Sequence, residues 1–178
     1  MKKIAVIILT LVLVSSLLGC SAPSSGSSGS SGSTGSSGSS GSSDTKTVSA
    51  YGMSLDVPKD WGELVDTTSE GFALFANEAT GMSIQSDGFS ISFMQTVVDT
   101  YITFDELTEF AQGDGRVVVI NNNNVYRETV SSSNNTGVIL MPDTGKTVNT
   151  AVMIVVDKNQ YDESKELLES IINSLVLK

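Results

Sequence analysis

The sequence predicts an α+β domain, an antiparallel sheet flanked by helices, preceded by a signal peptide and a disordered linker rich in Ser and Gly. Three observations predict this arrangement. Runs with the two-residue period of strands recur along residues 51–157, and short polar segments separate them. A segment with helical character interrupts these runs, and another follows them. Runs of strands with few helices are typical of a sheet covered by helices.

The chain begins with a leader of the secretory type. Two basic residues, Lys2 and Lys3, precede residues 4–18, which are apolar except for one Thr and two Ser. This block is shorter than the roughly 20 residues that a helix needs to cross a bilayer, and its pattern is that of a signal peptide. We therefore predict that residues 1–19 are a signal peptide.

The leader ends in Leu17-Leu18-Gly19-Cys20, which contains the only cysteine of the chain. This tetrapeptide resembles the lipobox of bacterial, in particular Gram-positive, lipoproteins. The resemblance implies that signal peptidase recognises Leu17, Leu18 and Gly19 and that the sulfur of Cys20 carries a diacylglycerol. Cleavage after Gly19 would expose the amino group of Cys20, and whether that group is also acylated is left open. Two or more acyl chains form a stable anchor. We expect a protein anchored by lipid on Cys20 to the extracytoplasmic face of the cell membrane; the alternative is an ordinary secretory leader with an incidental cysteine.

A polar linker follows the cysteine. Residues 21–43 contain 14 Ser and six Gly, and the glycines occupy every third position from 26 to 41. A collagen triple helix would need Pro between the glycines, and none occurs after Pro23 in this segment. A flexible coil of this length spans roughly 26 Å on average. Residues 20–45 are therefore predicted to be a lipidated cysteine and a flexible spacer, and glycosylation of the serines is left open.

Residues 46–178 are predicted to form one globular domain, long enough for a single core without disulfides. Its first predicted strand, residues 51–57, alternates apolar with small or polar side chains until Pro58, and residues 58–62 have the composition of a turn. Further strands are predicted over residues 72–76, 82–85 and 89–95, and in the last of them Phe89, Ile91 and Phe93 share one face.

A short helix is predicted over residues 104–112. Thr103 and Glu106 have the spacing of a capping box, in which each side chain binds the backbone N–H of the other residue. Gly113 is a suitable residue for ending the helix. The apolar stripe of this helix consists of Leu107, Phe110 and Ala111.

The second half of the domain is predicted to be a series of antiparallel hairpins, because its connections are short and polar. The strands are expected over residues 116–120, 124–130, 137–141 and 147–157. A final amphipathic helix is predicted over residues 162–175, with acidic residues in its first turn and a stripe formed by Leu167, Leu168, Ile171, Ile172 and Leu175. This stripe must cover one face of the sheet.

The two ends of the domain resemble those of PsbP-like domains. The matching stretches are YGMSLDVPKDW at residues 51–61 and LESIINSL at residues 168–175. The family includes photosystem oxygen-evolving subunits, the Ran-binding Mog family and many Gram-positive lipoproteins. The resemblance implies an α/β/α sandwich and a role in binding partners or assisting larger assemblies. It transfers no functional residue, because the matched positions are core and turn positions.

Composition excludes several kinds of chemistry. The chain has no His and one Cys, which excludes Ser-His-Asp and Cys-His catalysis, His-ligated metals, cysteine metal clusters and intrachain disulfides. Ten basic and twenty acidic side chains give a net charge of −10, and loss of Lys2 and Lys3 leaves eight against twenty, or −12. This charge disfavours nucleic acid and anionic lipid surfaces. No cofactor and no metal are expected, and membrane attachment rests on the lipid.

Three motifs have simpler interpretations than a ligand site. The sequence Gly145-Lys146-Thr147 resembles the end of a phosphate-binding loop, but Leu140 stands where a glycine is required, so we interpret it as a hairpin turn. Residues 157–162 lack the glycine of a calcium loop and are interpreted as the start of the last helix. The glycosylation sequon at Asn134 is interpreted as a polar loop.

No catalytic residue is predicted. Trp61 is interpreted as a core anchor beside the first strand, with ligand stacking as the alternative, and Asp105, Glu106 and Glu109 as members of a solvated helix face. The function we expect is that of a binding or accessory module, with a cell-envelope protein as a possible partner; a passive surface protein without a specific ligand is a variant of it. The alternative is a small extracytoplasmic hydrolase with two carboxylates in one cleft. The ligand and the oligomeric state are left open.

Overall fold

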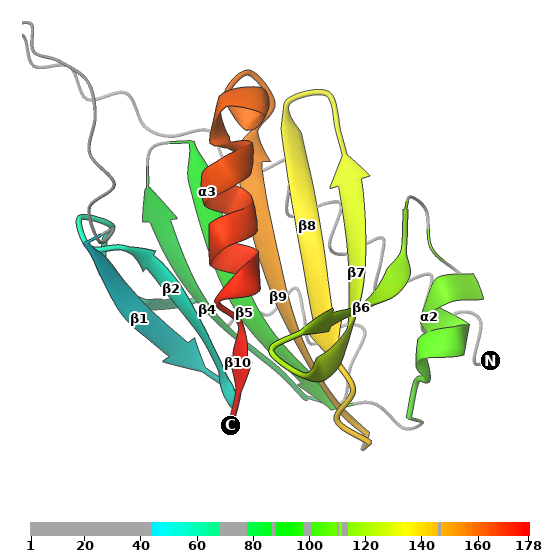
Figure 1. Ribbon diagram of the computed structural model, residues 1–178. Coiled ribbons are helices and arrows are strands. Elements are labelled where there is room, and N and C mark those ends of the chain that lie inside the picture. Colours follow the sequence, from blue (N-terminus) through cyan, green and yellow to red (C-terminus); the bar gives the residue numbers. More distant parts are fainter. Residues whose placement is uncertain are drawn as a thin grey trace, which may run out of the picture.

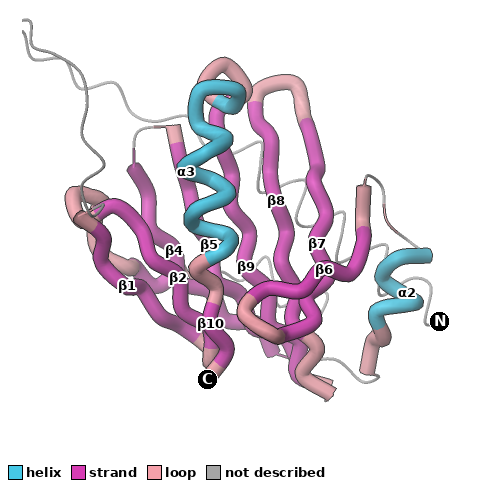
Figure 2. Tube along the Cα trace, in the orientation of Figure 1, coloured by secondary structure: helices cyan, strands magenta, loops and turns pink. Residues whose placement is uncertain are grey.

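The computed structural model describes residues 44–67, 78–86, 88–97, 101–109, 111, 114–145 and 147–178. The predicted signal peptide, Cys20, most of the predicted linker and the strand expected over residues 72–76 lie outside these residues. The described chain forms a seven-stranded and a three-stranded sheet with two helices, and every strand pair is antiparallel (Figures 1 and 2). The prediction of an antiparallel sheet flanked by helices is confirmed at this level.

The seven-stranded sheet contains nearly all the strands predicted from the period. Its order is β3-β4-β5-β9-β8-β7-β6. The four strands predicted in the second half are confirmed to within two residues at each end. The bounds are β3 Val65–Asp66, β4 Glu78–Ser86, β5 Phe89–Val97, β6 Arg116–Ile120, β7 Asn123–Ser131, β8 Asn135–Pro142 and β9 Val148–Asp157.

The three-stranded sheet was only partly predicted. It consists of β1 (Thr45–Ala50), β2 (Met53–Pro58) and β10 (Val176–Leu177), with β2 in the middle. Strand β2 matches the first predicted strand, and Pro58 ends it. Residue 51 lies in the turn before β2, where Tyr51 and Gly52 have φ values of 50° and 75°. Both are positive, as a tight hairpin turn requires.

Strands β1 and β10 have weak sequence signals. Val48 is the only buried residue of β1, so the strand shows no clear apolar alternation, and its first residue falls inside the segment assigned to the linker. Strand β10 has two residues, and neither of them is buried. Both segments are strands because they pair with β2, and such pairing cannot be deduced from local periodicity.

One face of the large sheet is covered by α3 (Tyr161–Asn173) together with the small sheet (Figure 1). Leu168, Ile171 and Ile172 are buried in this interface, whereas Leu167 is 37% exposed. The helix ends two residues before the predicted end. The Ser174 hydroxyl donates to the Ile171 carbonyl at 2.7 Å and accepts from the backbone N–H of Asp56 at 2.8 Å. The end of α3 is therefore fixed to β2.

The opposite face carries α2 (Phe104–Glu109), which buries Leu107 in a second apolar cluster. The capping box is confirmed: the Thr103 N–H donates to Glu106 Oε2 at 3.0 Å, and the Glu106 N–H donates to Thr103 Oγ1 at 3.3 Å. The predicted length is wrong, since the helix ends at Glu109 and Ala111 lies beyond it. Residues 110, 112 and 113 are outside the described chain.

The interpretation of Trp61 as a core residue is confirmed. Its side chain is 7% exposed, and its ring packs against that of Phe89 with the centroids 5.2 Å apart. Lys46 Nζ donates to the Trp61 carbonyl at 2.5 Å and to the Gly62 carbonyl at 2.8 Å, which fixes the turn after β2. Trp61 therefore stabilises the junction between the two sheets and has no face available for a ligand.

Leu168 and Leu167 provide a matched test of this packing. We expect Leu168→Ala to lower the free energy of unfolding by about 2 to 5 kcal/mol, because it leaves a cavity beneath α3. Leu167→Ala removes the same atoms from a partly exposed position and should cost less than about 1 kcal/mol. Urea unfolding of the two variants measures the difference. Equal losses would show that α3 does not pack as described.

Candidate interaction surface

The predicted lipidation residues Leu17, Leu18, Gly19 and Cys20 lie outside the described residues, so no geometry bears on them. The three motifs given simple interpretations behave as predicted where they are described. Residues 143–145 and 147 lie between two antiparallel strands, residues 158–160 form the turn before α3, and Asn134 lies in the loop between β7 and β8. Within the described chain, no group of His, Cys, Asp and Glu is arranged to hold a metal ion.

The candidate surface is the end of the large sheet that the β6–β7 hairpin forms. The hairpin turns at Asn121 and Asn122, which have positive φ values of 47° and 63°. Two such residues in succession are typical of a type I′ turn. The connection is therefore two residues long, and Asn123, which was expected in the loop, is the first residue of β7.

The tip of this hairpin is fixed to the end of α3. Asn121 Nδ2 donates to the Asn173 carbonyl at 3.1 Å and to the Leu175 carbonyl at 2.9 Å. Carbonyls at the end of a helix lack partners within the helix, so the side chain satisfies groups that would otherwise need water. Asn121 thus connects β6, β7 and α3 at one point.

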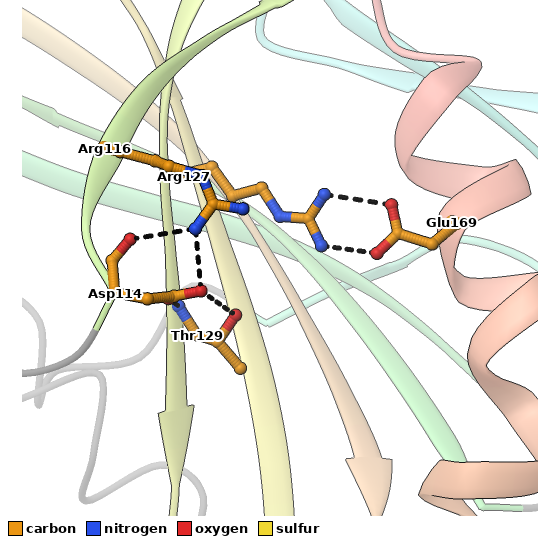
Figure 3. Close-up of polar contacts among 5 residues, drawn as sticks. All are labelled: Asp114, Arg116, Arg127, Thr129 and Glu169. Atoms are coloured by element: carbon orange, nitrogen blue, oxygen red, sulfur yellow. Dashed lines mark hydrogen bonds and ion pairs between the residues drawn. The ribbon is translucent and has the colours of Figure 1, made fainter.

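The middle of β7 is fixed to α3 by an ion pair (Figure 3). Arg127 donates from Nη1 and Nη2 to the two carboxylate oxygens of Glu169, at 2.9 Å and 2.5 Å. The Arg127 side chain is 16% exposed, and its Nε–H is buried without a hydrogen-bond partner. The hydrogen bonds from Arg127 hold the pKa of Glu169 below its ordinary value, although burial opposes this shift.

A second carboxylate compensates a cross-strand repulsion. Arg116 of β6 stands directly opposite Arg127 of β7, an arrangement that is unfavourable for like charges. Asp114 accepts a hydrogen bond from Arg116 Nη1 at 3.0 Å and another from the Thr129 N–H at 2.7 Å (Figure 3). Burial favours the neutral form of Asp114, but these hydrogen bonds outweigh it and lower the pKa. Each arginine therefore has its own carboxylate.

On the other face of β7, Glu128 is the only buried carboxylate of the described chain. It accepts a hydrogen bond from the Tyr126 hydroxyl at 2.8 Å. Burial, followed by the contact with Glu128, raises the pKa of Tyr126. A Cβ on Gly115 would lie 2.3 Å from this hydroxyl, so a glycine is needed for the backbone to pass over it. The pair is therefore closed off from solvent by the chain leading into β6.

Strand β6 forms one edge of the described sheet, and β3 forms the other. In a two-residue hairpin, the residues flanking the turn exchange backbone hydrogen bonds and the next pair does not. Because Ile120 and Asn123 flank the turn, the N–H and C=O groups of Val117 and Val119 point away from β7. Within the described residues, β6 pairs with β7 alone. The side chains of Val117 and Val119 are 44% and 70% exposed, so this edge presents apolar side chains beside backbone groups that pair with no other described strand.

Comparison with solved structures identifies the fold. The Synechocystis solution structure of cyanobacterial PsbP matches with a TM-score of 0.55 at 12% sequence identity, covering 81% of this chain and 98% of that one. The fold is PsbP-like. A Bacteroides thetaiotaomicron protein matches with a TM-score of 0.43 at 15% sequence identity, covering 71% of this chain and 45% of that one. A Pseudomonas aeruginosa protein of unknown function matches with a TM-score of 0.38 at 7% identity, covering 75% of this chain and 97% of that one.

At these identities the likeness concerns the fold and transfers no residue roles. No protein-family model matches the sequence, and a search of curated proteins found no similar chain. Within the described residues, no helix has the length and apolar character needed to cross a bilayer.

Local sequence patterns do not single out the residues of this surface. Arg127 and Glu169 are 42 positions apart, so only the packing of α3 on β7 brings them together. Val117, Val118 and Val119 gave the one available signal, since three consecutive valines cannot all face a core from an edge strand. Asp105 and Glu109 are exposed, as predicted for a solvated helix face, whereas Glu106 is half-buried and caps α2.

Asn121 and Asn122 allow a matched test of the hairpin anchor. Both have positive φ, so Gly relieves backbone strain equally at either position. We expect Asn121→Gly to lower the free energy of unfolding by about 1 to 2 kcal/mol through loss of two hydrogen bonds. Asn122, whose side chain bonds to none of the described residues, should tolerate Gly without loss. Urea unfolding measures both, and equal effects would contradict the anchor.

The ion pair predicts a pH-dependent stability difference. At pH 7, Glu169→Gln should cost about 1 kcal/mol, because the half-buried Arg127 loses its counter-charge. The folded-state pKa of Glu169 is lowered, so its contribution is present above the ordinary glutamate pKa of 4.5 and disappears as the pH falls through the lower, folded value. Urea unfolding at pH 7 and pH 3 should show the difference shrinking, and Glu166→Gln, at an exposed position, should show none. A difference that grows toward low pH would contradict the assignment.

Proposed function

We propose that this protein is a lipid-anchored binding or accessory domain on the extracytoplasmic face of the cell membrane, and not a catalyst. The single observation that carries the binding role is the β6 edge, where Val117 and Val119 are exposed and, among the described residues, no further strand pairs with the outward backbone groups. Soluble proteins usually block such an edge with a charge, a proline or a covering element. An edge left open and held in place is suited to receiving a partner.

The anchoring part of the proposal rests on Leu17-Leu18-Gly19-Cys20 and on the linker. Residues 21–43 separate the cysteine from β1, and a flexible chain of this length spans roughly 26 Å on average and about 80 Å when fully extended. In Figure 1, β1 lies at the opposite side of the molecule from β6 and α2. A tether entering at β1 therefore leaves the β6 edge free to face away from the membrane.

The fold supports an accessory role. With α3 and the small sheet on one face of the large sheet and α2 on the other, the arrangement agrees with the α/β/α sandwich of PsbP-like domains. Members of that family mostly bind partners or assist larger assemblies. A cell-envelope protein is the partner that the proposed location favours.

The hydrolase alternative has less support. It needs two carboxylates that share a cleft and perturb each other's ionisation. Glu128 is closed off beneath the segment that precedes β6, and Asp114 and Glu169 are each engaged by an arginine. Asp114 and Glu169, whose pKa values are lowered, hold strands in position, which is a structural role.

Cys20→Ala tests the anchor. Cells producing the full chain and fed an alkyne-bearing fatty acid should label the unaltered protein, because the thiol of Cys20 is the acceptor. The variant should lose the label and leave the membrane fraction, whereas Ser21→Ala, at the neighbouring position, should keep both. In-gel fluorescence and membrane fractionation measure the outcome. Label retained by the alanine variant would overturn the proposal.

A further inference from the structure

We propose that the face of the large sheet beneath α2 binds one soft monovalent metal ion, Cu(I), through the thioether sulfurs of Met94, Met141 and Met153. This site is separate from the β6 edge and goes beyond the proposed binding role. Thioethers are soft ligands that select Cu(I) over the hard cations that carboxylates bind. The chain has no His, and its one Cys lies outside the described residues, so methionine supplies the soft ligands of the described domain.

Methionine is concentrated on this face of the sheet. Of the eight buried residues in the cluster beneath α2, three are methionines, and their side chains are 4% to 6% exposed. The cluster on the opposite face contains Met53 alone among its 20 buried residues, which are otherwise mainly Val, Ile, Leu and Phe. Because methionine also fills irregular gaps in cores, the positions of the three residues decide between packing and ligation.

The register of the sheet places the three methionines around Ala151. Met94 of β5 lies directly opposite Ala151 of β9, and the pairing of β8 with β9 puts Met141 on the other flank. Met153 is two residues further along β9 on the same face, roughly 6.6 Å away, and neighbouring strands are about 4.8 Å apart. Methionine is unbranched with three rotatable bonds, so all three sulfurs can reach the space above the alanine methyl group.

A buried carboxylate on the same face favours a cation. Glu128 of β7 is 1% exposed and stands opposite Ile139, which in turn stands opposite Met153. Moving an ion into an apolar environment is costly unless an opposite charge lies nearby. Three thioethers carry no charge of their own, so one carboxylate suits a monovalent ion better than a divalent one.

The cover over the methionines is short. Helix α2 has six residues, and Leu107 is the one that it buries. Local opening of a short element costs less free energy than opening of the sheet beneath it. An ion therefore has a route to the three sulfurs that leaves the strands paired.

The experiment titrates the full chain, in detergent micelles and chloride-free buffer, with silver nitrate by calorimetry. Ag(I) stands in for Cu(I) because it is a soft monovalent ion that air does not oxidise. We expect one equivalent of Ag(I) to bind, and Cu(I) supplied as its bicinchoninate complex to be taken up in the same ratio. X-ray absorption at the copper edge should show sulfur neighbours.

Isosteric variants locate the site. Met141→Leu and Met153→Leu should each weaken Ag(I) binding at least about tenfold, because each removes one sulfur while nearly conserving volume. Met53→Leu is the matched control, since Met53 is 1% exposed in the cluster on the opposite face. It should bind as the unaltered chain does, and so should Cys20→Ala. Urea unfolding without metal should stay close to that of the unaltered chain, which separates lost ligation from lost packing.

Three results would overturn the inference. Absence of stoichiometric Ag(I) binding would leave the methionines as packing residues. Equal weakening in Met53→Leu and Met153→Leu would show that the ion does not select the face beneath α2. Loss of binding in Cys20→Ala would assign the ion to the cysteine sulfur.

Discussion

Burial of β9 on both of its faces is the constraint on which the rest of the fold depends. Eight consecutive residues of this strand, 149–156, are buried. Even-numbered positions face α3 and the small sheet, and odd-numbered positions face the cluster beneath α2. A central strand that is apolar on both sides requires cover on both sides of the sheet. The small sheet with α3 covers one face, and α2 covers the other.

The same constraint separates the structural polar groups from the exposed ones. On the α2 side of β7, Glu128 is buried and accepts a hydrogen bond from the Tyr126 hydroxyl. Toward the β6 end of the sheet, ion pairs and hydrogen bonds hold the strands in place. Arg127 binds Glu169 of α3, and Asp114 accepts from the Thr129 N–H. Where the cover ends, at Val117 and Val119, apolar side chains meet solvent. The candidate interaction surface thus lies where the cover of the sheet ends.

Local signals were sufficient for most elements and insufficient for contacts between distant segments. The capping box at Thr103 predicted where α2 begins, and the stripe through Leu168 and Ile172 predicted which side of α3 is buried. Strand β10 and the pairing of Arg127 with Glu169 depend on how α3 lies across the sheet. No local pattern contains that information. The two-residue asparagine turn was mistaken for a longer loop because consecutive positive φ values at non-glycine residues are uncommon.

Residues 173–177 have a consequence for the order in which the molecule is completed. They accept the hydrogen bonds of Asn121, hold the backbone of Asp56 through Ser174, and supply the third strand of the small sheet. The ribosome adds them after every segment that they join. The two hairpins that they connect, β1–β2 and β6–β7, therefore stay unconnected until residues 173–177 have left the exit tunnel.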